Sequence, residues 1–540
     1  MGHQDDACYD GIIIGAGHHG LILGNYLAQA GLRVLLIERR GQYGGGLSTE
    51  QRTLPGFRHN LHSINHFSVT STPWYRDLGL DARVPYVTPR YEFAQPHADG
   101  SALIFSRDLD ETLANIARFS PKDAKTFREW NARAEEMTRR IFLHERFSEP
   151  LAPDERDELL SASAMGREFL ALTRRQPGEV VEDLFEDERL KVLFLFKLSL
   201  FGTVLHETLG TSSPLGSLIR AFDLATGYQL CQGGSWNLAR GLMDRFVSSG
   251  GHYVDNAHVE RIIVDAGRAS GVELADGRTL RARSFVASTV DVHQTFESMI
   301  GRDQLPSAYR DKVDAFHYTS WSLFGVHFAL KEAPGYTSAS FDPNINRALK
   351  YNIGSEAIAS LMEAHREVDN GRVPSNVQFG GGALSVLDPT QAPPGRHTAY
   401  AWHVVPYDPA KDPAAVQQEN EALADGILEK WRAYAPNMVP DNVLGRYCYS
   451  AHDYANEIIN MRGGDIFMGE LSADQVMHNH FGYRTPIGGL YMAGSAAHPN
   501  GAITGGAGYI SAGLIARDLG LAPWWKPVDA RVELADLGVE

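Results

Sequence analysis

The sequence predicts an α/β protein, and three stretches of the chain support this prediction. The first forty residues indicate an apolar strand, a glycine-rich turn, a helix and a second apolar strand, as in a unit built on a parallel sheet. Residues 258–289 indicate three more strands, with a turn at Asp276-Gly277. Residues 320–330, 376–386 and 397–406 are rich in aromatic and β-branched side chains, which favours a second, antiparallel sheet.

The opening unit carries a dinucleotide fingerprint. Gly15, Gly17 and Gly20 lie between the strand expected at 9–14 and the helix expected at 21–30, and Glu38 ends the next strand. Gly15 permits the tight turn, Gly17 lets the backbone approach a pyrophosphate, and Gly20 lets helix and strand pack closely. Glu38 stands where an acid accepts hydrogen bonds from a ribose. The alternative is a glycine turn without a ligand, but we predict a Rossmann-like domain.

The residues after Glu38 favour FAD over NAD. Arg39 and Arg40 lead into Gly44-Gly45-Gly46, a second close approach of the backbone that suits the remaining length of a flavin. Only one fingerprint is visible, because Gly380-Gly381-Gly382 lacks a preceding strand and a following helix in the right order. The cysteine pair of disulfide reductases is also missing, since Cys8, Cys231 and Cys448 are far apart.

Composition excludes several classes of protein. The 540 residues are 43% hydrophobic and 21% charged, as in an ordinary globular protein. The net charge of -16 makes a nucleic-acid partner a poor candidate, because phosphate neutralisation supplies that affinity. Few cysteines and no visible signal or myristoylation pattern at the N-terminus predict a cytoplasmic protein.

Several motifs together resemble one protein family. They are GAGHHGL at 15–21, LIERRGQYGGG at 36–46, FSPKDAKTF at 119–127, GGSWNLARGL at 233–242, VERIIVDAGRASGVELADG at 259–277 and the segment 488–519. These stretches resemble, in order, the phytoene-desaturase-like branch of the FAD-dependent amine oxidase superfamily. The similarity is specific at the two ends of the chain and loose in its helical middle.

The resemblance implies a set of cofactor-binding residues. The ADP half of FAD would be held by Gly15, Ala16, Gly17, Gly20, Glu38 and Arg39. Gly45 and Gly46 would lie near the ribityl and pyrophosphate groups, and Val259 would hold the adenine through its backbone. Gly494 would meet the pyrophosphate, while Ala502, Ile503 and Thr504 would pass the isoalloxazine. Ala502 and Ile503 make this wall bulkier than the glycine-rich family pattern. We expect FAD to bind all the same, but the substrate can differ from that of the family.

The expected architecture is a discontinuous Rossmann-like FAD-binding domain with a mixed-sheet plus helical substrate domain. We place the FAD-binding domain at 1–70, 225–300 and 480–520, the substrate-binding domain at 71–224 and 301–479, and a C-terminal tail at 521–540. Helices are expected over 108–147, where Ser120-Pro121 is a good helix start, and over 151–225.

Candidate catalytic residues are histidines. His59, His62 and His66 follow the glycine run, and His498 lies in the closing motif. They could accept a proton or orient the substrate. The alternatives are a polar loop for the first three and a structural role for His498. The spacing of His59, His62 and His66 would allow them to share a metal ion. No acidic residue accompanies them and the sequence indicates no clear helix there, so we predict no metal site.

The main functional prediction is an FAD-dependent oxidoreductase that removes hydride from an apolar or aromatic small molecule, as a desaturase or dehydrogenase. Oxygen or a quinone would accept the electrons. The alternatives are an amine or alcohol oxidase using oxygen, a flavin-dependent isomerase, and a non-catalytic lipid carrier of the GDP-dissociation-inhibitor type. The apolar stretch at 192–205 is too short to span a membrane. It predicts either a buried helix or peripheral membrane contact.

Overall fold

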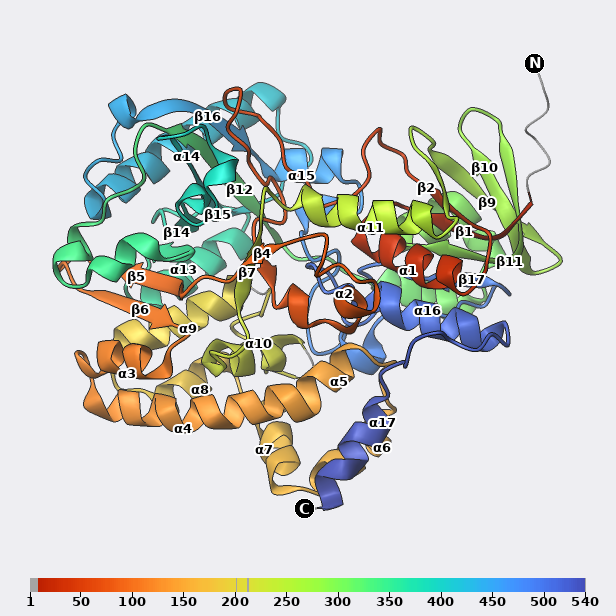
Figure 1. Cartoon of the computed structure of the whole chain (residues 1–540), viewed down its shortest axis with the longest axis horizontal. Coiled ribbons are helices and arrows are strands. Elements are labelled where there is room, and N and C mark those ends of the chain that lie inside the picture. Colours follow the sequence, from red (N-terminus) through yellow and green to blue (C-terminus); the bar gives the residue numbers. More distant parts are fainter. Residues whose placement is uncertain (1–7, 201, 211–212, 540) are drawn as a thin grey trace.

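The computed structural model describes residues 8–200, 202–210 and 213–539 (Figure 1). Two large sheets lie on opposite sides of the molecule, and a layer of helices lies beneath the left-hand sheet in this view. The α/β architecture predicted from the sequence is confirmed.

The first sheet has strand order β8-β2-β1-β11-β10-β9, with β17 paired to the end of β11. Strands β1, β2, β8, β11 and β17 pair in parallel, whereas β9, β10 and the start of β11 are antiparallel. The parallel strands β1 and β2 are short apolar runs, because helices cover the sheet. The bounds are β1 Cys8–Ile14, β2 Val34–Ile37, β8 His252–Val254, β9 Val259–Asp265, β10 Arg268–Leu274, β11 Thr279–Ser288 and β17 Leu490–Met492.

Three helices pack into one core with this sheet, namely α1 His18–Gln29, α11 Trp236–Ser248 and α16 Gly506–Asp518. The strands of this sheet come from three distant stretches of chain. All of these strands fall within the segments proposed as the FAD-binding domain. The domain limits themselves stay a prediction.

The second sheet is mixed, with order β16-β12-β15-β14-β13-β5-β6. All pairs are antiparallel except β13 with β5. The antiparallel pairing predicted for the aromatic stretches is confirmed, since Trp321 to Leu330 pairs with Pro406 to His397 residue by residue. The bounds are β5 Tyr91–Pro96, β6 Ala102–Ser106, β12 Trp321–Leu330, β13 Lys350–Ile353, β14 Phe379–Gly382, β15 His397–Pro406 and β16 Val443–Tyr449.

The glycine run in β14 has a packing role. A Cβ at Gly381 would lie 2.7 Å from the Tyr400 carbonyl oxygen, and one at Gly382 would lie 2.4 Å from that of Leu349. Helices α13 Ile358–Asp369 and α14 Pro413–Tyr434 flank this sheet.

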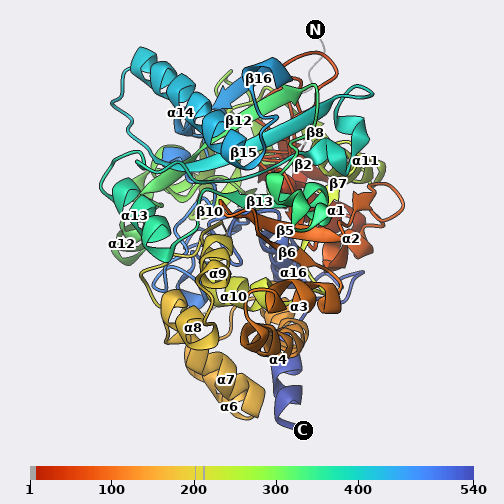
Figure 2. The ribbon, with the colours of Figure 1, turned by 90° about the vertical axis from the view of Figure 1, so that its left-hand side faces the viewer.

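The helical layer lies below the second sheet in Figure 2. It contains α3 Leu109–Ala117, α4 Pro121–Met137, α5 Leu143–Arg146, α6 Pro153–Ser161, α7 Ala164–Thr173, α8 Pro177–Leu184, α9 Glu188–Leu200 and α10 Ser213–Phe222. The helix expected over 108–147 is broken at 118–120, because the Ser120 hydroxyl caps α4 by accepting the Asp123 N–H at 3.0 Å. A π-helical turn at Thr138–Phe142 then joins α4 to α5.

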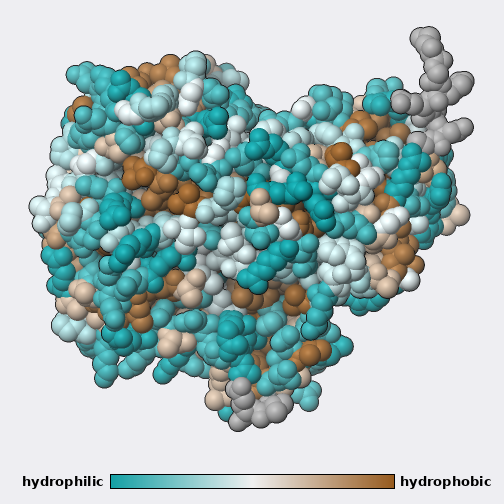
Figure 3. Space-filling view, in the orientation of Figure 1, coloured by the Kyte–Doolittle hydropathy of each residue, from teal (hydrophilic) through white to brown (hydrophobic). Residues whose placement is uncertain are grey.

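Most of the apolar stretch at 192–205 lies in helix α9. Residues 192–199 are buried in the core of the helical layer, with Phe194 and Phe222 rings 4.4 Å apart. The described part of 192–205 therefore forms a buried helix and the turn that continues it. Membrane contact through this stretch stays a prediction, because its described apolar side chains are packed inside the protein. Figure 3 shows apolar residues in separated groups among hydrophilic ones on the face in view. No helix formed by the described residues has the length and apolar character needed to cross a bilayer.

Smaller elements connect these layers. Strands β3 His66–Phe67, β7 Tyr228–Cys231 and β4 Tyr86–Val87 form a third sheet, and α2 Pro73–Asp77, α12 Ser307–Ala315 and α15 Ala451–Glu457 are short helices. The C-terminal tail, which carried no sequence prediction of structure, packs on the first sheet's helices: Trp525 is buried, with its ring 4.7 Å from that of Tyr26 in α1. Helix α17 Ala530–Ala535 follows.

Candidate FAD and substrate site

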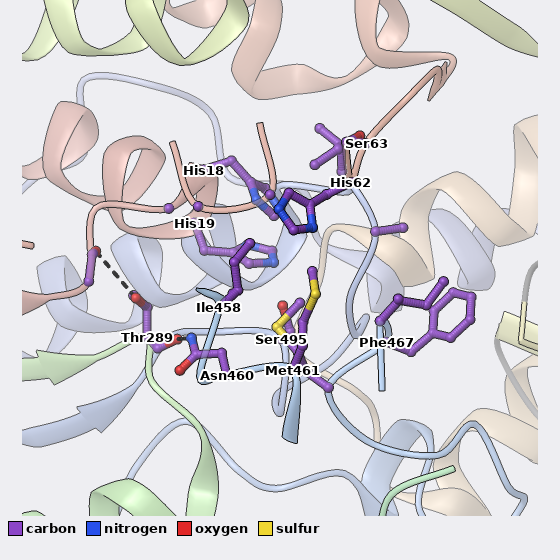
Figure 4. Close-up of a pocket in the computed structure, with 18 of the residues that line it drawn as sticks. His18, His19, His62, Ser63, Thr289, Ile458, Asn460, Met461, Phe467 and Ser495 are labelled. Carbon is purple, nitrogen blue, oxygen red and sulfur yellow. Dashed lines mark hydrogen bonds between the residues drawn. The ribbon is translucent and has the colours of Figure 1, made fainter. Parts of the chain in front are cut away.

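One cavity of about 580 Å³ extends from the glycine turn to the second sheet. Its wall is formed by residues from both large sheets, the helical layer and the segment 458–471. Thr289, at the end of β11, is held there by its hydroxyl, which donates to the Ile14 carbonyl at 2.8 Å, and by Asn460, which donates to its carbonyl at 3.0 Å (Figure 4).

The glycine turn has the geometry that a pyrophosphate requires. Gly15 has a φ of 97°, and a Cβ on Gly20 would lie 2.1 Å from the Gly15 carbonyl oxygen. At Gly17 an added Cβ would meet only the Cα of Gly45, at 4.0 Å, so the backbone is open to the cavity there. Helix α1 begins after Gly17 without a side-chain cap. Its first N–H groups therefore suit a phosphate.

The acid at the end of β2 is fixed by the backbone. The Glu38 carboxylate accepts the N–H groups of Ala16 and Arg40, both at 2.9 Å. Glu38, Arg39 and Val259 line the same end of the cavity. Ala16 and Gly20 do not line it. Their predicted part in cofactor binding stays a prediction.

The closing motif lies on the other side of this groove. Ala502, Ile503 and Thr504 line the cavity, and Gly494 packs against the backbone of Thr289, 2.4 Å from its carbonyl oxygen to an added Cβ. Ala502 has a φ of 60°. Gly45 and Gly46 also line the cavity, so all the predicted cofactor residues except Ala16, Gly20 and Gly494 form part of its wall.

The four candidate catalytic histidines separate into two pairs. His62 and His66 line the cavity, whereas His59 and His498 do not. His59 Nε2 is 2.8 Å from the Thr53 hydroxyl, and His498 Nε2 is 2.7 Å from the Glu145 carbonyl oxygen. Burial lowers the pKa of His62 and of His66 to about 3. Both imidazoles are therefore neutral near neutral pH.

His62 is tied to a polar chain that leads outward. Its Nε2 is 3.2 Å from the Tyr449 hydroxyl, which in turn donates to the half-buried Glu457 carboxylate at 3.0 Å. Because Tyr449 has one hydroxyl proton, His62 Nε2 donates and Nδ1 is left as an acceptor. Nδ1 has no hydrogen-bond partner among the described residues. His62, His18 and His19 point toward the same part of the cavity (Figure 4).

Sequence reasoning missed the cationic side chains of the cavity. Arg146, Arg220 and Lys350 are buried and line it, together with the aromatic rings of Tyr228 and Trp402. A lone lysine in an apolar strand and a lone arginine in an apolar helix are the only signals that the sequence offers. No group of three or more His, Cys, Asp or Glu side chains that could hold a metal is found within 8–200, 202–210 and 213–539.

Parallel strands with a glycine turn, an uncapped helix and an acid at the ribose position define a dinucleotide-binding protein. Residues 20–518 match the family described as flavin containing amine oxidoreductase, and the chain belongs to this family. It is an FAD-dependent oxidoreductase of the phytoene-desaturase-like branch. This confirms the enzyme and cofactor predictions over the lipid-carrier alternative.

Named relatives cover almost the whole chain. A subunit of limonene dehydrogenase from Castellaniella defragrans is 31% identical, over 98% of this chain and 98% of that protein. Phytoene desaturase (lycopene-forming) of a Paracoccus species is 26% identical, over 94% and 96%. Among solved structures, putrescine oxidase bound to putrescine has a TM-score of 0.58 at 15% identity over 95% and 99%, and cyclohexylamine oxidase from Brevibacterium oxydans one of 0.56 at 18% identity over 95% and 100%. These two structures share the fold.

Proposed function

We propose that the chain is a dehydrogenase or desaturase that removes hydride from a hydrophobic or aromatic small molecule and passes the electrons to oxygen or a quinone. The observation that carries the proposal is the continuity of the cavity: the groove at Gly17 opens into a chamber lined by apolar and aromatic side chains. These include Leu200, Leu323, Trp402, Tyr454, Met461, Phe467 and Leu471. The named relatives, a limonene dehydrogenase subunit and phytoene desaturases, support an apolar substrate.

The protein's part in this chemistry is to hold, orient and exclude water. Bound FAD supplies the hydride acceptor. The residues around Gly17, Glu38 and Thr504 would hold it, and the buried chamber would hold the substrate away from solvent. We assign to His62 the acceptance of a substrate proton at Nδ1, because the chain through Tyr449 to Glu457 gives that proton a route to the half-buried carboxylate. His66, whose Nδ1 is 2.6 Å from the Tyr86 hydroxyl, is assigned to substrate contact.

The test is anaerobic reduction of the FAD-loaded protein by a panel of candidate substrates, followed by absorbance. The panel contains a cyclic monoterpene, a long polyene, a primary amine and a primary alcohol of similar length. We expect a hydrocarbon to bleach the flavin absorbance. Oxygen and a soluble quinone are then compared, and whichever reoxidises the reduced flavin faster is identified as the electron acceptor. Bleaching by the amine or alcohol alone would replace the proposal with an oxidase. Conversion without bleaching would indicate an isomerase.

A further inference from the structure

Three buried cations line the cavity. Arg146 in α5 is 7% exposed, Arg220 in α10 is 9% exposed, and Lys350 in β13 is 3% exposed. They come from the helical layer and the second sheet, whereas the glycine turn and α1 belong to the first sheet (Figures 1 and 2). The site expected for the cofactor phosphates, at the start of α1, is therefore formed by other elements.

Two of these cations lack a polar partner within the described chain. No hydrogen bond or ion pair joins the Arg146 guanidinium to a described residue. It lies over the rings of Phe142 and Phe147, at 5.8 and 5.9 Å. The Lys350 Nζ likewise makes only ring contacts with described residues, 4.7 Å from the Tyr228 centroid and 5.9 Å from that of Trp402. No described residue therefore neutralises either charge through an ion pair.

Arg220 extends this group. Its guanidinium donates to the Gly216 carbonyl and the Ser217 hydroxyl, both at 3.1 Å, and lies 4.7 Å from the Phe67 ring and 4.9 Å from the Phe142 ring. Burial lowers the pKa of Arg220 to about 9, and the nearby charge of Arg146 also lowers it. Sharing the Phe142 ring, the two guanidinium groups form a pair.

Four acids among the described residues line the cavity; Glu260 is exposed, and the other three are held by other groups. Glu145 forms an ion pair with Arg156, Glu38 is held at the end of β2, and Glu457 bonds to Tyr449 and Arg52. The buried Glu92 raises the pKa of Lys350, but it shares its charge with Lys197 and Arg107. Burial still lowers the pKa of Lys350 to about 7 and that of Arg146 to about 10. Buried cations without compensation are costly, so an anionic ligand would relieve them.

We propose that the cavity binds an anionic group of the substrate, a carboxylate or a phosphate, through Arg146, Arg220 and Lys350. The substrate is then amphipathic, with an apolar body in the chamber and a charged end at these residues. The inference rests on the proposed function and narrows its substrate class. Planar guanidinium groups bind carboxylate and phosphate oxygens in two-point contacts, and aromatic neighbours keep the site dry.

The test measures equilibrium binding to the FAD-loaded protein through the perturbation of flavin absorbance. The probes are decanoate, decyl phosphate and 1-decanol, which share one chain length. We expect at least one of the two anions to bind at least about tenfold more tightly than the alcohol, as for hydrogen bonds to charged groups. Whichever anion binds more tightly identifies the class of group.

Variants locate the effect. Arg146→Gln and Lys350→Met should each remove most of the preference for the anion and leave the affinity for 1-decanol unchanged. Arg146→Lys, which keeps a cation, should retain part of it. Arg174→Gln, at an exposed arginine of the same helical layer, is the matched control and should change nothing. The FAD content of each variant is measured alongside.

Distinct outcomes overturn distinct claims. If decanol binds but neither anion is preferred, the anion site is wrong and the proposed function stands. If the variants lose FAD or weaken all three probes equally, the cations serve the cofactor or the fold and the inference is again wrong. If none of the probes binds to protein that holds FAD, the chamber does not bind apolar molecules as the proposed function requires. The inference, which rests on the proposed function, is then wrong as well.

Discussion

Gly17 and Gly20 belong to one turn, yet the structure gives them different roles. A Cβ at Gly20 would collide with the Gly15 backbone, whereas a Cβ at Gly17 meets nothing closer than 4.0 Å and projects toward the cavity. Gly17 also has a φ of −68°, which alanine adopts freely. Gly17 is thus required for ligand binding, and Gly20 is required for the fold.

We predict that Gly17→Ala lowers the affinity for FAD at least about tenfold, or about 1.4 kcal/mol, without changing the stability of the protein after FAD removal. Gly20→Ala should destabilise that protein by about 1–3 kcal/mol, because backbone must move. Urea unfolding and FAD titration measure the two effects. Gly178→Ala is the control, since nothing lies within 4 Å of its added Cβ. Equal loss of stability in the Gly17 and Gly20 variants would refute the distinction.

The histidines give a second prediction at this scale. His62→Gln should slow anaerobic flavin reduction by about 10²-fold, the usual contribution of a general base, while His59→Gln and His498→Gln should mainly lower stability. The physical reason is position, since neither His59 nor His498 lines the cavity. Their ring nitrogens are instead close to the Thr53 hydroxyl and the Glu145 carbonyl oxygen. Stopped-flow absorbance measures the rate. An unchanged rate in His62→Gln would remove the proton-acceptor role.

At the scale of elements, residues 192–196 of helix α9 are all apolar because this part of the helix is buried on all sides. Phe194 lies within a cluster of rings that includes Phe127, Phe185 and Phe222. We predict that Phe194→Ala destabilises the protein by about 3–5 kcal/mol, measured by urea unfolding. Val247→Ala, in α11 and 55% exposed, should stay within about 0.5 kcal/mol of the parent. A small effect of Phe194→Ala would mean that α9 is loosely packed.

Elements differ in how well the sequence predicts them. The strands at 8–14, 34–37, 321–330 and 397–406 are predicted because each is an apolar or alternating run with clear ends. Strand β13 is missed, since it is short and begins with Lys350, and the break at 118–120 is visible only as a cap at Ser120. The tail is missed because Trp525 finds its partner, Tyr26, some 500 residues away. Long-range pairing of this kind leaves no local pattern.

The candidate site shows the same division. The cofactor groove is predicted because its glycines and Glu38 form a local pattern. The chamber is not, because Arg146, Arg220, Lys350 and Trp402 come from four separate elements and meet only in the folded chain. Among the histidines, spacing alone does not separate His62 and His66 from His59.

At the scale of the whole molecule, buried neutral histidines make the fold sensitive to acid. His480 Nδ1 lies 3.0 Å from the Ala496 carbonyl oxygen, and burial lowers the pKa of His480 to about 4 and that of His498 to about 3. The unfolded chain takes up these protons near pH 6.5, before the folded chain does. The free energy of unfolding therefore falls as pH falls from about 6.5 toward 4, by up to about 1.4 kcal/mol per histidine and pH unit.

Urea unfolding at several pH values between about 7 and 5 checks this slope. His498→Gln should show a shallower decline than the parent, because one proton-binding group is removed from the unfolded chain. The control is His252→Gln, at an exposed position in β8, which should keep the parent slope. A decline that is identical in all three proteins would assign the acid sensitivity to other groups.

The central claim is that one cavity holds FAD at the glycine turn of α1. The most direct measurement is the absorbance spectrum of the purified protein before and after heat denaturation, with the released compound compared with FAD and FMN. The account predicts flavin bands and one FAD per chain. The FAD is released to the supernatant, or stays on the precipitate if it is covalently attached, and Gly17→Ala is predicted to hold less of it. A colourless protein that cannot be reconstituted with FAD would contradict it.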